Sequence, residues 1–182
     1  MPFLSPLDTR AYRPGEFVLL GHFGFECELP DRGRFQLWTP RGFVTDFASI
    51  PWAVQILPGF DVNGPSRYAA IPHDWLYCNQ GRVEIVPRDW YSGQLQPPLR
   101  VRLTRAECDE VFRQALLAIG GDCFTRAAIE EPYGAAQARL FWSSVRAGGW
   151  WYWRKRRAGV DRSYDFAPEG YLGRVPCAGG GA

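Results

Sequence analysis

The first part of the chain alternates apolar and polar positions with a period of two, which is the pattern of half-buried β-strands. Residues 23–29 are apolar at nearly every second position, and residues 35–38 repeat the alternation. Turn-forming Pro, Gly and Asp residues interrupt these runs at 30–33 and at 40–42. We therefore expect residues 17–45 to form a small antiparallel β-meander.

After this region the apolar positions change to helical spacing. A helix over residues 66–79 would bury a face of small and apolar side chains that includes one histidine. That face consists of Ala69, Ala70, His73, Leu76 and Tyr77. Asp74 would lie at the edge of the same face. Pro72 lacks a backbone donor, so it would kink this helix or delay its start.

Thr104 and Glu107 form a capping box, which predicts that a helix begins there. The apolar stripe that follows extends to Ile119, and Gly120 would end the helix. Asp109 lies at the edge of this stripe, so its carboxylate would point partly toward the core. The sequence thus places a second ionisable side chain, after His73, close to the interior.

The remaining segments are less regular. Ser49 is a plausible cap for a short helix that runs to about residue 57. Residues 81–103 contain β-branched residues and prolines, and we interpret them as an irregular hairpin. A helical pattern with a break at Pro132 covers residues 125–146, and an aromatic and then basic stretch follows at 150–157.

These patterns predict an α+β fold, with an N-terminal antiparallel β-meander followed by a helical half. In that half we expect the His-Asp helix to pack on the 104–119 helix. We divide the chain into an extended arm (1–16), a single α+β domain (17–157) and a tail (158–182). Because the arm and the tail are rich in Pro or Gly, we expect them to pack little against the domain and to mediate assembly.

Composition excludes several classes of protein. The 182 residues suit one domain, and 46% hydrophobic residues are enough for a core. A net charge of +2 argues against a specific nucleic-acid-binding protein. The five cysteines are widely spaced, so we expect neither a disulfide framework nor a zinc cluster. Neither a signal peptide nor an apolar run of about 18 residues, as a membrane span needs, is visible.

The candidate chemistry centres on His73. A histidine that accepts a proton from water needs an acceptor that holds its other ring nitrogen, and Asp109 is the candidate for that role. Asp74 could then bind a hard cation such as calcium. Asp46 is a second candidate metal ligand, although it could equally cap the turn into the next helix. His73 itself could also be only a buried, hydrogen-bonded core residue.

Three segments carry a resemblance to a known family. They are residues 42–51 (GFVTDFASIP), 69–77 (AAIPHDWLY) and 106–112 (AECDEVF). Together they resemble domain-of-unknown-function family 1353, which is found in phages and bacteria, and the likeness covers roughly residues 15–150. This resemblance implies a phage or prophage origin, and with it a location in the virion or the host cytoplasm.

A weaker likeness concerns the two helices alone. Small-small-x-x-His-Asp-x-x-Tyr, followed by a helix with Asp-x-x-Phe, is similar to the catalytic helices of phospholipase A2 enzymes, most closely the disulfide-free form in parvovirus capsid proteins. This similarity implies that His73 is the base, that Asp109 orients it, and that Asp74 binds calcium. The chain departs from that pattern at Pro72, and it has no clear glycine-rich calcium loop.

Two functions follow from this reading. The first is a phage-type, virion-associated structural or accessory protein that joins other virion proteins. The alternative is a calcium-dependent hydrolase that uses a His73–Asp109 dyad on a lipid or cell-envelope substrate. A zinc peptidase is disfavoured by the shortage of His and Cys ligands. A membrane or lipid contact through Trp150, Trp151, Trp153 and Arg154 is a further expectation, with packing against the domain or a partner as its alternative.

Overall fold

The computed structural model describes residues 2–47, 64–119, 134–157 and 166–167. Its larger sheet has four strands in the order β3-β4-β6-β7, and every neighbouring pair is antiparallel. These strands are β3 (Phe23–Leu29), β4 (Gly33–Thr39), β6 (Arg82–Pro87) and β7 (Leu99–Arg102). A smaller sheet has the order β1-β2-β5, again antiparallel. It consists of β1 (Thr9–Arg13), β2 (Glu16–Leu19) and β5 (Val44–Thr45).

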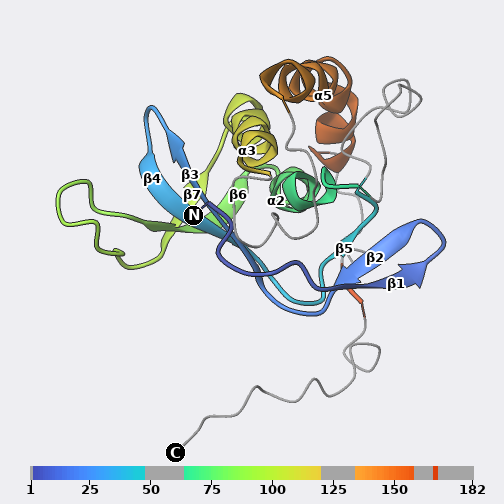
Figure 1. Ribbon diagram of the computed structural model, residues 1–182, viewed down its shortest axis with the longest axis horizontal. Coiled ribbons are helices and arrows are strands. Elements are labelled where there is room, and N and C mark those ends of the chain that lie inside the picture. The colour runs from blue at the N-terminus through green and yellow to red at the C-terminus, as the bar shows by residue number, and fades with distance from the viewer. Residues whose placement is uncertain (1, 48–63, 120–133, 158–165, 168–182) are drawn as a thin grey trace, which may run out of the picture.

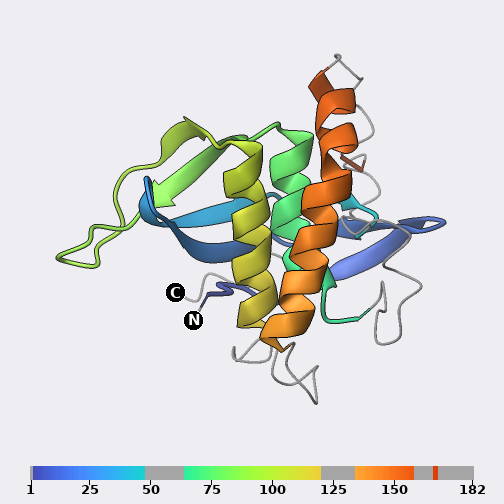
Figure 2. The same cartoon turned by 90° about the horizontal axis from the view of Figure 1, so that it is seen from above.

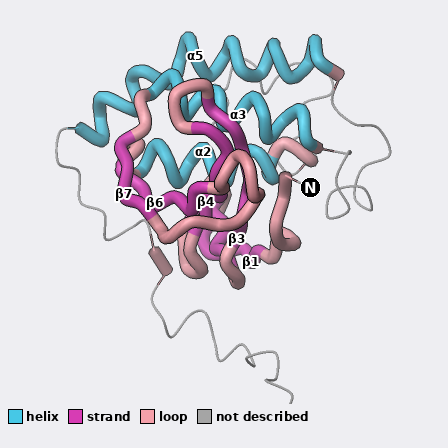
Figure 3. Tube along the Cα trace, turned by 90° about the vertical axis from the view of Figure 1, so that its left-hand side faces the viewer, coloured by secondary structure: helices cyan, strands magenta, loops and turns pink. Residues whose placement is uncertain are grey.

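Three helices cover one face of the larger sheet (Figure 1). Helices α2 (Arg67–Cys78) and α3 (Arg105–Ala118) pack directly on the strands, and α5 (Ala135–Arg157) lies on the side of α2 and α3 away from the sheet. Figure 2 shows the three helices side by side, and Figure 3 shows the layers from sheet to α5. The predicted α+β class and the antiparallel strands are confirmed.

The core lies between the sheet and the helices because the alternating strands turn their apolar side chains toward this layer. Phe25, Phe35 and Leu37 come from the strands, and Ile71 and Phe112 come from the helices; all five are fully or almost fully buried. The pattern predicted the strands well. It did not predict that the strands of 17–45 would divide between two sheets, because a period of two defines the faces of a strand and not its partner.

The expected extended arm is wrong for the described residues 2–16. The side chain of Phe3 is completely buried, and Phe3 forms a bridge with Phe25. The amide of Glu26 donates to the carbonyl of Pro2 (2.6 Å). Strand β1 then pairs with β2. The Pro and Gly content of this segment reflects turns between paired strands, and not a lack of packing.

The helical half differs from expectation at its C-terminal end. Helix α5 continues through Gly148 and Gly149 to Arg157, so the predicted end near residue 146 is wrong. Of the predicted tail, residues 158–165 and 168–182 lie outside the described residues. The two described residues do pack on the domain: Phe166 bridges Phe43, and Ala167 is buried. The predicted short helix at 49–57 also lies outside the described residues.

The predicted His-Asp helix and the irregular hairpin are both present. Helix α2 begins at Arg67, so Pro72 lies inside it and does not delay its start. Gly81 joins α2 to β6 with a φ of +71°, and an added Cβ would lie 2.0 Å from the carbonyl oxygen of Leu103. Only glycine fits this close approach. Gly81 therefore determines where the chain turns from α2 into β6, and so where the hairpin begins.

Candidate functional site

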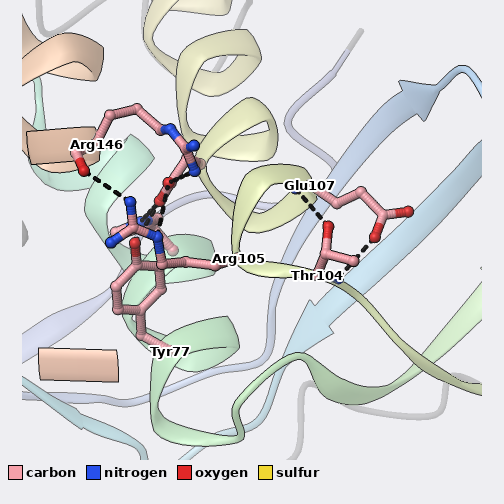
Figure 4. A network of polar contacts seen from close by, with 7 residues as sticks. Tyr77, Thr104, Arg105, Glu107 and Arg146 are labelled. Atoms are coloured by element: carbon pink, nitrogen blue, oxygen red, sulfur yellow. Dashed lines mark hydrogen bonds and ion pairs between the residues drawn. The ribbon is translucent and has the colours of Figure 1, made fainter. Parts of the chain in front are cut away.

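The site is built on α3, whose start is defined by the predicted capping box. The Thr104 hydroxyl accepts from the amide of Glu107 (3.2 Å), and the Glu107 carboxylate accepts from the amide of Thr104 (2.6 Å), as Figure 4 shows. These bonds satisfy helix N-terminal donors that would otherwise lack partners. With the start of α3 set at Arg105, Asp109 falls on the buried face, and its side chain has no exposed surface.

Four side chains from three helices surround the Asp109 carboxylate. The Nε2 atom of His73 lies 3.2 Å from Oδ1, and the Tyr77 hydroxyl donates to the same oxygen. On the other oxygen, Nη1 of Arg146 donates to Oδ2 (2.8 Å), and Nε of Arg105 lies 3.8 Å away. Figure 4 shows Tyr77, Arg105 and Arg146 approaching the same point. Asp109 therefore links α2, α3 and α5.

These contacts determine the charges within the site. Burial would raise the pKa of Asp109, but the bonds from His73, Tyr77 and Arg146 outweigh it, so the pKa lies below its usual value and the group is a carboxylate. Burial lowers the pKa of His73 despite the opposing effect of Asp109, so the ring is neutral at pH 7. Burial and the Asp109 charge raise the pKa of Tyr77, so its hydroxyl keeps its proton.

A neutral His73 has one N–H group and one lone pair. The geometry assigns the N–H to Nε2, since the Asp109 carboxylate can only accept. The lone pair is then on Nδ1, which is buried and has no hydrogen-bond partner among the described residues. The ring is 2% exposed and contacts the rings of Tyr77 and Phe112, at centroid distances of 4.1 and 4.9 Å. The site therefore contains an oriented, unprotonated imidazole nitrogen.

Helix α5 approaches this site closely because it has a glycine where it crosses Tyr77. An added Cβ on Gly149 would lie 2.8 Å from the Tyr77 hydroxyl oxygen. One turn further along, Trp153 packs edge-on against the Tyr77 ring, with the centroids 5.1 Å apart. Trp153 is half-buried and packs on the core, which is the alternative that the sequence left open beside a lipid contact. The side chains of Trp150, Trp151 and Arg154 lie outside the described part of the structure.

Both candidate metal ligands lie beside Thr45: Asp46 follows it in the chain, and Asp74 is hydrogen-bonded to it. The Thr45 hydroxyl donates to the Asp74 carboxylate, and the hydroxyl oxygen of Thr45 accepts from the amide of Phe47. Asp46 lies between these two residues and is exposed. Among the described residues, no group of three or more His, Cys, Asp or Glu side chains is close enough to hold a metal ion. We therefore assign no chemical step to calcium, and the role of Asp74 and Asp46 as metal ligands stays a prediction.

The comparison with known families agrees with the sequence motifs. A family model described as "Protein of unknown function (DUF1353)" matches residues 24–129. The chain belongs to this family. The DUF1353 region includes His73, Asp74, Asp109 and Asp46, whereas α5 lies outside it. No curated protein and no solved structure matched the chain.

The sequence identified two members of the site and missed three. Arg105 precedes Asp109 by four residues, a spacing that brings helical side chains together, so that contact could have been foreseen. Tyr77 lies four residues after His73 and was named only as part of a motif. Arg146 gave no signal, because it comes from a helix more than 30 residues further along the chain.

No described helix is long and apolar enough to cross a membrane.

Proposed function

We propose that the site is hydrolytic and that His73 acts as its general base. The observation that supports this is the state of the imidazole: Asp109 holds Nε2, while Nδ1 is unprotonated and has no hydrogen-bond partner among the described residues. This arrangement is the one that a base needs to accept a proton from water. The substrate class that the phospholipase-like motif implies is a lipid or cell-envelope ester.

In this proposal Nδ1 takes a proton from water as the water oxygen attacks the ester carbonyl, and Nδ1 then returns that proton to the leaving alkoxide oxygen as the ester C–O bond breaks, which gives an acid and an alcohol. The imidazolium that forms lies against the Asp109 carboxylate, which stabilises the new positive charge. Arg146 and Tyr77 keep Asp109 ionised and in position, so they are positioning residues. Because the ring is 2% exposed, substrate must displace neighbouring side chains before it reaches Nδ1.

The test is the hydrolysis of phospholipid and envelope esters by the wild type and by His73→Gln, which keeps a polar side chain. The base role predicts a loss of rate on the order of 10²-fold or more. Tyr77→Phe is the matched control: it removes one bond to Asp109 but leaves both His73 nitrogens, so it should lower the rate far less. Failure of the wild type to hydrolyse any of these esters would refute the proposal.

The metal role implied by the resemblance is tested in the same assay. Rates are measured with calcium and with a chelator, for the wild type and for Asp74→Asn. A rate that falls with the chelator, and is low and calcium-independent in Asp74→Asn, would support Asp74 as a calcium ligand. The same rate under all four conditions would remove calcium from the mechanism and leave the His73 proposal unchanged.

We propose as a second function that the protein associates with other components of a phage particle. A groove between α3 and α5, with a volume of about 330 Å³, favours it. The groove is lined by Arg113, Leu117, Ala135, Ala138, Arg139 and Trp142. Leu117 is exposed although it lines this groove. An exposed leucine in an apolar groove is typical of a surface that another protein covers.

Association is tested by substituting the exposed leucine of the groove. Leu117→Asp should reduce the amount of protein that copurifies with particles, without lowering the thermal midpoint, because this side chain is already exposed. Arg10→Ser, an exposed substitution on β1, is the control and should leave association intact. Unchanged copurification of Leu117→Asp would contradict a role for this groove.

A further inference from the structure

The loop between β6 and β7 exposes large apolar side chains to an unusual degree. Trp90 is 73% and Tyr91 is 96% exposed, and Leu95 is about half exposed, as is Leu99 at the start of β7. Figure 1 shows this loop extending well beyond the end of the sheet, away from the helices. Single exposed apolar residues are ordinary on a protein surface, but a group on a projecting loop indicates a contact surface.

The loop is held in place by its own hydrogen bonds. The Asp89 carboxylate accepts from the amides of Tyr91 (3.1 Å) and Ser92 (2.7 Å) and from the Ser92 hydroxyl (2.8 Å). The bonds from Ser92 lower the pKa of Asp89, so it stays ionised and engaged in the turn. Nη1 of Arg88 donates to the carbonyl of Gly93 (2.6 Å). These bonds order the turn that carries Trp90 and Tyr91, which reduces the conformational entropy lost on binding.

The loop is also anchored to the sheet. Arg88 forms an ion pair with Glu26 (2.7 Å), whose side chain is almost completely buried on β3. Arg34 contacts the other oxygen of Glu26 (2.5 Å). These three charged side chains fix the base of the loop to strands β3 and β4. The tip of the loop therefore projects from a rigid part of the sheet.

The strands behind the loop have an excess of positive charge. Arg82 lies directly opposite Arg102, and Glu84 lies opposite Arg100. Because opposed residues and their second neighbours share a face, these four side chains lie on the exposed face of the hairpin. Arg82 and Arg102 form no ion pair with any carboxylate of the described residues. Like charges placed directly opposite each other destabilise a hairpin, and an anionic surface would relieve this repulsion.

We propose that the β6–β7 hairpin docks on an anionic lipid bilayer. Trp90 and Tyr91 lie at the headgroup level, where amphipathic rings are favoured, and the arginines of the exposed face lie near lipid phosphates. The open edge of β7 does not favour an added peptide strand instead, because β7 is short and follows Pro97 and Pro98. This inference is independent of the proposed hydrolysis, since it uses none of the residues around Asp109.

Cosedimentation with vesicles tests the docking. The full chain should bind vesicles of phosphatidylcholine mixed with phosphatidylglycerol, and bind pure phosphatidylcholine much more weakly. Arg82→Gln with Arg102→Gln should weaken binding to the mixed vesicles by roughly tenfold or more, since each arginine near an anionic surface contributes about fivefold. The charge-matched control is Arg10→Gln with Arg139→Gln, at two exposed positions elsewhere, which should change binding little.

The contribution of the aromatic side chains to membrane binding is tested by the same cosedimentation assay. Trp90→Ser with Tyr91→Ser should also weaken vesicle binding by at least tenfold, whereas Leu117→Ser with Leu140→Ser should not. Brominated acyl chains should quench part of the tryptophan fluorescence of the wild type, and Trp90→Phe should lose that part while it still sediments with vesicles. Equal binding by the Trp90 and Tyr91 double variant would overturn the proposal, as would binding to single-stranded DNA but not to mixed vesicles.

Discussion

The contact between Gly149 and Tyr77 allows a sharp test of how the site is held together. A helical glycine that is replaced by alanine normally stabilises a protein by about 0.5–1 kcal/mol. Here the new Cβ would lie 2.8 Å from the Tyr77 hydroxyl oxygen and 3.2 Å from its Cε1 atom. Either the Tyr77 side chain or one of the two helices must shift, and we expect the shift to move the hydroxyl away from Asp109.

The magnitude follows from the loss of that bond. Asp109 has no exposed surface, so water cannot replace the Tyr77 hydroxyl without further rearrangement. A buried group that loses its hydrogen bond costs about 1–3 kcal/mol. This cost exceeds the gain in helix propensity, so we expect Gly149→Ala to lower the free energy of unfolding by roughly 1–2 kcal/mol. For a chain of this length that corresponds to a thermal midpoint lower by about 2–4 °C per kcal/mol.

The assay is urea unfolding of a set of four variants. Gly148→Ala is the matched control, because Gly148 is the adjacent helical glycine and is exposed; it should be neutral or stabilising. Tyr77→Phe removes the hydroxyl, so Gly149→Ala should be less harmful in that background than in the wild type, by about 1 kcal/mol. If Gly149→Ala stabilises the wild type as much as Gly148→Ala does, the close approach of α5 to Tyr77 is refuted.

Three further changes have expected outcomes. Thr104→Ala should reduce the free energy of unfolding by about 1 kcal/mol, measured by urea unfolding, since it removes the cap of α3. Gly81→Ala should prevent native folding or destabilise it by more than about 2 kcal/mol, since its Cβ would overlap the Leu103 carbonyl; a native circular dichroism spectrum and an unchanged midpoint would contradict this. The pKa of His73 is lower in the folded protein than its usual value of 6.5, so the unfolded chain binds the extra proton first as the pH falls. The stability that neutral His73 provides is therefore full above about pH 6.5 and declines below it. His73→Gln should lose this component. The difference in the free energy of unfolding between His73→Gln and the wild type should therefore shrink from pH 7 to pH 5.

The local elements of this protein were determined by the sequence alone. The alternation at residues 23–29 defined a strand with one buried face, and the capping box at Thr104 defined where α3 begins. From that start, the helical period placed Asp109 on the inner face. The same period turned His73 inward from α2. Signals of this kind lie within a few residues of one another, so they can be read from the chain directly.

The tertiary structure decided what depends on distant contacts. Burial of Phe3 made residues 2–16 part of the core, although their composition resembles an arm. Packing against Tyr77 carried α5 through Gly148 and Gly149, although glycine pairs usually end helices. Arg146 reaches Asp109 only because α5 lies across α2 and α3. Local propensity amounts to less than about 1 kcal/mol per residue, and a buried aromatic side chain or a bond to a buried carboxylate outweighs it.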